Sequence, residues 1–233
     1  MIVKAIKTKI FKEGDDLFSF ILGHLKKIPE ASVLIVTSKI VSLSEGRVVD
    51  YQGEEAKVEL IKSESDLAIP TKYVWLTVKD KMVMASAGID DSNANGKLIL
   101  LPKDSFKAAA SLRIKLKKKF KLKQLGVIIT DSRTIPLRAG TTGVALGYAG
   151  LQGLKQYHGQ KDLFGRKFEF ARVSVVDSLA AAAVLEMGEG NECRPLALIK
   201  EAPLKFQNQI NRRELDIDLE DDMYAPFFAQ AKK

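Results

Sequence analysis

Two short runs of mostly β-branched residues most constrain what this chain can fold into. Residues 31–37 read ASVLIVT, and residues 126–130 read GVIIT. Apolar runs of this length and composition are typical of buried strands. The second run is followed at once by Asp131. We therefore expect two buried strands, the second of which ends at an acidic side chain.

The rest of the chain mixes strand and helix patterns without a strict alternation. Helical spacing of apolar residues behind Asp15 and Asp16 predicts a helix over 15–28, which Pro29 ends. A turn or short helix that leads into a strand is expected over 38–50. A surface helix is expected over 54–67, a basic helix over 105–123, and a small-residue helix over 178–187. Further strands are expected at 2–9, 73–78, 81–87, 97–101, 173–176 and 196–199. The fold class that fits is α+β.

Composition narrows the class of protein. The chain has 233 residues, 46% of them hydrophobic, which is enough for a sizeable core in one large domain or two small ones. Its net charge of +8 favours anionic partners. Cys193 is the single cysteine, and no apolar run approaches a membrane span or a signal peptide. A reducing compartment, the cytoplasm, is the expected location.

Two segments carry acids behind apolar runs. AGIDDSN at 87–93 places Asp90 after a glycine break, and IITDSRTIPLRAG at 128–140 places Asp131 ahead of Arg138. Carboxylates at strand ends suit Mg²⁺ or Mn²⁺, which take oxygen ligands, and an arginine there is able to hold a phosphate or carboxylate. Either segment alone favours an ordinary turn or helix cap. The two together leave the metal site and the capped turns as even alternatives.

Other motifs point less clearly to chemistry. GTTGVALGYAG at 140–150 matches neither dinucleotide nor P-loop patterns, and its glycine spacing favours close packing of a helix or strand. The lysine-rich run at 113–123 contains one aromatic residue, Phe120, so we expect a solvated helix face and not a nucleic-acid platform. His24 is expected at the core boundary and His158 in a surface loop. The acidic end at 214–222, with aromatic residues at 224–228, predicts either docking onto a partner or disorder.

Six blocks of the sequence together resemble the coenzyme F420-0:γ-glutamyl ligases. They are KEGDDL, SEGR, AGIDDSN with the following LPKDS, TDSRTIPLRAGTTGVALGYAG, KDLFGR and DSLAAAAVLEMGEG. The blocks occur in the family's order and extend over roughly residues 10–200. A chance match to one block is easy, whereas an ordered match to six is not.

The resemblance implies a reaction and an architecture. GTP phosphorylates a carboxylate of coenzyme F420-0, and L-glutamate attacks the acyl phosphate to form an amide. Two divalent ions, Mg²⁺ or Mn²⁺, and a monovalent cation such as K⁺ accompany such sites. The family's arrangement implies a homodimer of two intertwined lobes, one formed by 1–64 plus 168–233 and the other by 65–167. The partners expected are GTP, L-glutamate and an anionic acceptor, with no membrane.

The resemblance also assigns residues. Asp90 and Asp131 match metal-binding aspartates, and Ser132 and Glu189 match further metal positions. The matching nucleotide positions are Thr8, Lys9, Ile10, Ser38, Lys39, Asn93, Gly188, Gly190 and Arg194. Together with Asp90 and Asp131, Arg138 is the catalytic candidate.

One departure keeps alternatives open. Family members often carry a lysine near the phosphates where this chain has Leu43, so that either Lys39 substitutes or nucleotide handling differs. The same chemistry on a folate-type acceptor is the first alternative. A non-catalytic homologue that binds nucleotide or RNA is the second.

Overall fold

A five-stranded sheet forms the centre of the molecule in this computed structural model, which describes the backbone of residues 1–230 and the side chains of residues 1–227. The strand order is β1 (Ile2–Ile6), β12 (Leu196–Lys200), β2 (Ser32–Thr37), β8 (Leu125–Thr134) and β9 (Thr141–Ala149). Only β2 and β8 run parallel, with Thr37 opposite Thr130. Both buried strands predicted from the β-branched runs are confirmed, and they lie side by side.

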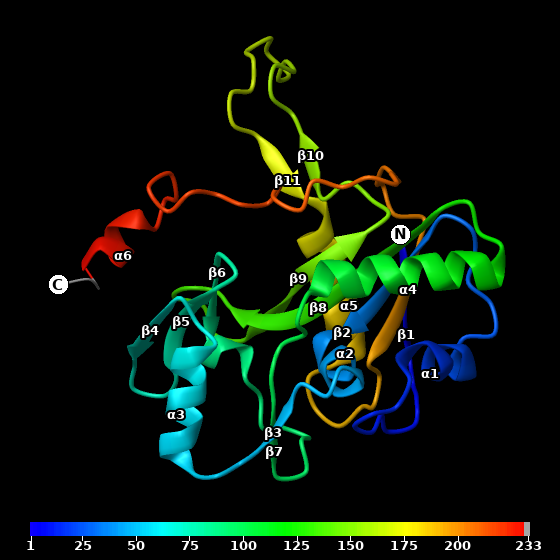
Figure 1. The fold of residues 1–233 in the computed structure, drawn as a ribbon. Helices are drawn as coiled ribbons and strands as arrows, with labels where there is room; N and C mark the ends of the chain where they lie inside the picture. Colours follow the sequence, from blue (N-terminus) through cyan, green and yellow to red (C-terminus); the bar gives the residue numbers. More distant parts are fainter. Residues whose placement is uncertain (231–233) are drawn as a thin grey trace.

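Helices cover both faces of this sheet, because side chains alternate along each buried strand. Val127 and Ile129 face a cluster formed with α1 (Leu17–His24), α2 (Ser38–Ser44) and α4 (Ser105–Phe120). Ile128 faces the opposite cluster, which α5 (Val175–Met187) closes. The long helix α4 lies across one face of the sheet in Figure 1.

Smaller sheets extend from the central one. Strands β4 (Leu67–Pro70), β5 (Trp75–Lys79) and β6 (Met82–Ala85) form an antiparallel sheet beside α3 (Glu54–Ser63). Strand β3 (Val48–Asp50) pairs with β7 (Lys97–Ile99), and β10 (Leu154–Gln156) pairs with β11 (Arg172–Ser174). Figure 1 shows the β10–β11 hairpin projecting from the body of the molecule. Helices and mixed sheets together confirm the α+β class.

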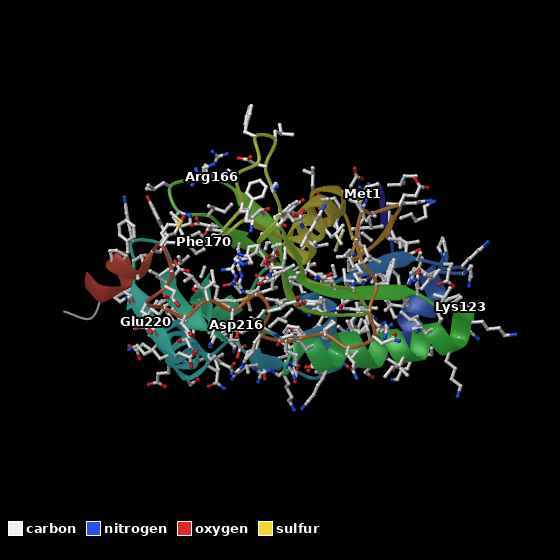
Figure 2. All side chains as sticks on the ribbon, turned by 90° about the horizontal axis from the view of Figure 1, so that it is seen from above. Met1, Lys123, Arg166, Phe170, Asp216 and Glu220 are labelled. Carbon is white, nitrogen blue, oxygen red and sulfur yellow. The ribbon has the colours of Figure 1, made fainter. Side chains whose placement is uncertain are left out.

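The chain after β12 crosses the molecule as an extended segment and ends in α6 (Ala225–Gln230). Figure 2 shows Asp216 and Glu220 on this segment, far from Lys123 beyond the end of α4. Asp216 and Asp218 lie 3.8 and 3.5 Å from the Lys81 ammonium. The Glu214 carboxylate accepts hydrogen bonds from the Tyr148 hydroxyl at 2.5 Å and the Gly153 amide at 2.8 Å. The part of this segment up to Asp218 is therefore tied to the body. Among the expected aromatic residues of the tail, Phe228 lies outside the described side chains.

Several predicted boundaries were wrong. The strand expected over 2–9 ends at Ile6, and the helix expected over 15–28 spans only Leu17–His24, because Leu25 already has extended backbone angles. Strand β8 does not end at Asp131 but continues to Thr134, because β9 pairs with it along that length after a bulge at Ile129/Thr130. The helix expected over 54–67 ends at Ser63, and Leu67 already belongs to β4. Helix α5 starts at Val175 and not at Ser178. Ser174 caps it, because its hydroxyl oxygen accepts from the Asp177 amide and its hydroxyl group donates to the Asp177 carboxylate.

Three glycines of the 140–150 segment, at 143, 147 and 150, serve packing as expected, whereas no atom lies within 4 Å of a Cβ at Gly140. A Cβ at Gly143 would lie 2.5 Å from the Ala180 carbonyl oxygen of α5, and one at Gly147 would lie 2.5 Å from the Phe106 amide of α4. Strand β9 therefore approaches helices on both of its faces. The division into two lobes stays a prediction. The central sheet itself takes strands from both predicted segments. Among the described residues, no helix has both the length and the apolar character that crossing a membrane requires.

Candidate functional site

Asp131 lies on β8 just beyond the point where its parallel neighbour β2 ends. Thr37, the last residue of β2, pairs with Thr130, so that Ser38 at the start of α2 lies beside Asp131. The Ser38 hydroxyl donates to Asp131 Oδ1 at 3.3 Å. Burial raises the pKa of the Asp131 carboxyl, against the lowering effect of Arg133, and the negative charge of Asp90 also raises it. A carboxylate in this position gains stability from any added cation.

Asp90 lies in a loop whose backbone is held by hydrogen bonds to β7. Its backbone exchanges two hydrogen bonds with Ile99 of β7, at 2.9 and 2.8 Å. The preceding Ser86 and Ala87 have positive φ angles of 49° and 56°, a conformation that costs energy for residues with a side chain. The buried Thr77 hydroxyl oxygen accepts from the Ala87 amide at 2.8 Å and so supports this turn.

The Asp90 carboxylate is paired with a cation of the protein itself. Lys39 of α2 places its ammonium 2.6 Å from Asp90 Oδ2 and donates to both oxygens of Ser92, at 2.9 and 3.1 Å. Ser92 donates to Asp90 from its amide at 2.7 Å and from its hydroxyl at 3.0 Å. Burial alone would raise the pKa of Asp90, but the bonds from Lys39 and Ser92 lower it below its ordinary value.

The loop 188–194 after α5 connects most of the other predicted residues. The Ser132 hydroxyl donates to Glu189 Oε1 at 2.5 Å, and the Asn93 amide donates to the Gly190 carbonyl at 3.2 Å. Gly188 has φ of 81°, and a Cβ there would lie 2.4 Å from the Glu192 carboxyl carbon. The loop therefore requires glycine at 188.

The N-terminal nucleotide candidates lie against the end of the same loop. The Thr8 amide donates to the Cys193 carbonyl at 2.9 Å. The Lys9 amide donates to His24 Nε2 at 3.2 Å, while His24 Nδ1 is 2.8 Å from the Phe20 carbonyl, which gives this histidine a structural role. Ile10 is 74% exposed and presents a free apolar surface. Arg194 holds the end of α5 through the Glu186 carbonyl at 3.3 Å.

Two candidates lie elsewhere. Arg138 is exposed in the turn between β8 and β9, and the described residues offer its guanidinium no hydrogen bond, so its catalytic role stays a prediction. Leu43 packs its side chain against the core cluster of α1, α2 and α4. Lys39 is therefore the cation of α2 that contacts the site.

Arg133 was missed as a site residue. The sequence interpretation ends the strand at Asp131 and gives Arg133, two residues later, no role. In the structure it lies two residues further along the same strand, on the face to which Asp131 points. Its Nη1 donates to the Val83 carbonyl of β6 at 2.9 Å. The alternation of side chains along a longer strand is the signal that would have found it.

The donor set fits a hard divalent cation with shared ligands. Within residues 1–230, no three His, Cys, Asp or Glu side chains gather as a complete metal cage. The carboxylates of Asp90 and Asp131, with the hydroxyls of Ser92 and Ser38 beside them, are all oxygen donors. Mg²⁺ in nucleotide sites usually takes one or two carboxylates and completes its shell with phosphates and water. The partial cage is therefore of the kind expected where a nucleotide supplies the remaining ligands.

Known proteins resemble this chain over most of its length. The sequence model of the family described as F420-0:Gamma-glutamyl ligase matches residues 5–201. The chain belongs to this family. The match includes the residues around Asp90 and Asp131 and the loop 188–194, and it ends just after β12.

Curated relatives support the assignment over most of the chain. A coenzyme F420:L-glutamate ligase of Methanococcus maripaludis strain S2 is 36% identical over 171 residues, which are 73% of this chain and 68% of the relative. The enzyme of that name from Archaeoglobus fulgidus is 34% identical, with 82% and 83% of the two chains covered. The one from Methanocaldococcus jannaschii is 29% identical, with 95% and 96% covered. Membership of this ligase family is thus established from both its profile and its members.

Proposed function

We propose that this protein is a GTP-dependent γ-glutamyl ligase that adds L-glutamate to coenzyme F420-0. The observation that carries the proposal is that Asp90, paired with Lys39, lies near enough to Asp131 for its charge to act on that carboxyl, in a chain belonging to this ligase family. Relatives that cover most of the chain bear the name coenzyme F420:L-glutamate ligase. The GTP dependence and the acyl phosphate are the finer parts of the proposal.

The proposed reaction has two balanced steps. A carboxylate oxygen of the acceptor attacks the γ-phosphorus of GTP, and the bond to the β-phosphate oxygen breaks to release GDP. The glutamate amine then attacks the acyl carbon, loses a proton, and the phosphate leaves. Phosphoryl transfer of this kind needs positioning and charge neutralisation more than covalent help from the protein. Bound divalent cations supply that neutralisation at the phosphate oxygens.

The residues of the site divide these tasks. Asp90 and Asp131, with Ser132 and Glu189 beside them, are the groups that would hold Mg²⁺ or Mn²⁺. Ser38 fixes the orientation of Asp131 by its hydrogen bond. Asn93 and the Gly190 backbone form one wall for the nucleotide, and they already contact each other. A monovalent cation and a homodimer remain parts of the proposal that rest on the family resemblance.

Lys39 has two tasks in this proposal. In the structure its ammonium neutralises Asp90 and lies between that carboxylate and Ser92. A divalent cation on Asp90 would compete for the same oxygen, which would free Lys39 to contact the nucleotide phosphates. Lys39 would then supply the positive charge that family members often have at the position of Leu43, because a leucine packed on the core offers no charge to a phosphate.

Product mass tests the acceptor. The full-length protein is incubated with GTP, Mn²⁺, L-glutamate and either coenzyme F420-0 or a folate. The mass of each acceptor after the reaction is then measured by mass spectrometry. A glutamyl residue added to coenzyme F420-0 alone supports the proposal. Addition to the folate alone moves the same chemistry to the folate-type acceptor. No addition to either acceptor would contradict the ligase proposal and favour a non-catalytic homologue.

A further inference from the structure

We propose that Arg133 is a substrate-binding residue whose guanidinium holds a carboxylate of the ligase reaction. The inference rests on the proposed function and concerns a residue that lies within the TDSRTIPLRAG block but that neither the family resemblance nor the metal site gives a role. It starts from the position of Arg133 on β8, two residues beyond Asp131 on the same face of the strand. Any group bound to Arg133 is thereby adjacent to the proposed phosphoryl-transfer centre.

Only part of the guanidinium is used by the protein. Nη1 donates to the Val83 carbonyl of β6 at 2.9 Å, which fixes the side chain between the central sheet and the three-stranded sheet. Nε and Nη2 are both buried, and no acceptor within residues 1–230 lies in hydrogen-bonding reach of either. These two nitrogens share one edge of the planar group. That edge is the one that grips a carboxylate through two parallel hydrogen bonds.

The negative charges around Arg133 favour a carboxylate over a phosphate as its ligand. Asp131, Asp177 and Asp80 act on Arg133 through their charges, without a hydrogen bond to it. A multiply charged phosphate would be repelled by three neighbouring carboxylates more strongly than a singly charged carboxylate. Phosphates also have a better place beside Lys39 and the metal-binding aspartates. A carboxylate of L-glutamate or the carboxylate of the acceptor therefore fits the free edge best.

A purely structural role for Arg133 does not explain why two of its guanidinium nitrogens have no hydrogen-bond partner in the described residues. One hydrogen bond to Val83 joins the two sheets, and a neutral donor would suffice for it. A buried charge whose other donors lack partners is a cost to the free protein, and a bound anion removes that cost. The free edge is thus explained by a ligand and not by the connection between the sheets.

Arg133→Lys tests the proposal, because lysine keeps the charge and loses the two-donor edge. Arg213→Lys is the matched control, since Arg213 is exposed and its side chain has no hydrogen bond or ion pair in the described residues. Full-length wild-type protein and both variants are titrated calorimetrically with L-glutamate and, in a separate arm, with coenzyme F420-0, each in the presence of Mn²⁺ and a non-hydrolysable GTP analogue. The Michaelis constants for the two substrates and the melting temperatures are measured alongside.

The expected result is a loss of affinity of about tenfold or more for one of the two carboxylate substrates in Arg133→Lys, with the same rise in its KM. The KM for GTP, the melting temperature and the Arg213→Lys control stay at wild-type values, and the affected arm names the bound carboxylate. Equal carboxylate affinity in wild type and Arg133→Lys, including no binding to either, would overturn the proposal. The proposal would also be overturned if the melting temperature of Arg133→Lys fell so far that partial unfolding explained its weaker binding. The binding arm needs no turnover, so a ligase assay without product rejects the proposed function without deciding the role of Arg133.

Discussion

Lys39 Nζ lies 2.6 Å from Asp90 Oδ2, so the carboxylate expected to hold a divalent cation is already held by the protein's own ammonium group. Asp131, the other expected metal ligand, is hydrogen-bonded to the Ser38 hydroxyl and is more deeply buried. The two aspartates therefore differ in how the free protein accommodates their charge. This difference has consequences for metal affinity and for stability.

Asp131→Asn and Asp90→Asn should each lower the rate of glutamate transfer by roughly 100-fold or more, because each removes a negative charge that would hold the cation. Their effects on folding should be opposite. Burial raises the pKa of Asp131, so its ionised form is disfavoured in the folded state at neutral pH, and Asp131→Asn should raise the melting temperature. Thermal unfolding of the metal-free proteins checks this.

For Asp90→Asn the melting temperature should fall slightly, because Lys39 loses its partner. The side chains of Lys39 and Asp90 are 26% and 42% exposed, so solvent limits the loss to no more than about 1 kcal/mol. Undiminished glutamate transfer in both variants would remove the metal assignment.

Lys39→Met should change metal and nucleotide binding in opposite directions. Without the ammonium group, Asp90 no longer has a competing cation, and Mn²⁺ alone should bind about tenfold more tightly. GTP should bind more weakly, because Leu43 supplies no charge in its place. Calorimetric titrations with Mn²⁺ and then with GTP measure both. Lys118→Met, which changes an exposed lysine of α4 with no side-chain hydrogen bond or ion pair in the described residues, serves as the charge-matched comparison. Unchanged Mn²⁺ affinity in Lys39→Met would contradict the competition.

Gly147→Ala should destabilise the protein by about 1–3 kcal/mol, because its new Cβ would meet the backbone of α4 at 2.5 Å. Gly23→Ala adds the same methyl group in α1, where no atom lies within 4 Å. A glycine in a helix interior costs stability, so Gly23→Ala should be neutral or stabilising by up to about 1 kcal/mol. Denaturant unfolding of the two variants measures the contrast. Equal effects would mean that β9 does not approach α4 this closely.

Glu64 should make stability depend on pH in the acidic range. It is paired with Arg47 at 2.8 Å and also with Lys79, and these bonds lower its pKa below the ordinary value of 4.5 although burial alone would raise it. A lowered carboxyl pKa stabilises the fold above the unfolded value and loses that effect as pH falls. At pH 7, Glu64→Gln should therefore cost about 1–3 kcal/mol. The difference from wild type should shrink below about pH 4.5, and a difference independent of pH would refute the pairing.

The sequence predicted most elements because their patterns are local. Strand β2 and the first half of β8 are mostly apolar, and α4 has a long helical spacing that begins at the capping residue Asp104. Strand β4 was missed because four residues that end in Pro70 carry too little pattern, and their strand identity depends on pairing with β5. The extension of β8 to Thr134 likewise depends on its partner β9.

The site divides in the same way. Asp90 and Asp131 were found from local motifs, and the resemblance added Ser132 and Glu189, which contact each other across 57 positions of sequence. The pairing of Lys39 with Asp90 and the free edge of Arg133 were not predictable, because each depends on side chains that meet only in three dimensions. Arg138, which the motif favoured, lies in an exposed turn, whereas Arg133 is held between two sheets.

Oxygen-18 transfer tests the proposed ligase reaction most directly. Coenzyme F420-0 labelled in its acceptor carboxylate is incubated with GTP, Mn²⁺, L-glutamate and the full-length protein, and the released phosphate is weighed by mass spectrometry. An acyl phosphate intermediate predicts one labelled oxygen in each phosphate, one phosphate for each amide formed, and neither product with Asp131→Asn. Amide formed with unlabelled phosphate, or no amide at all from the wild-type protein, would contradict the account.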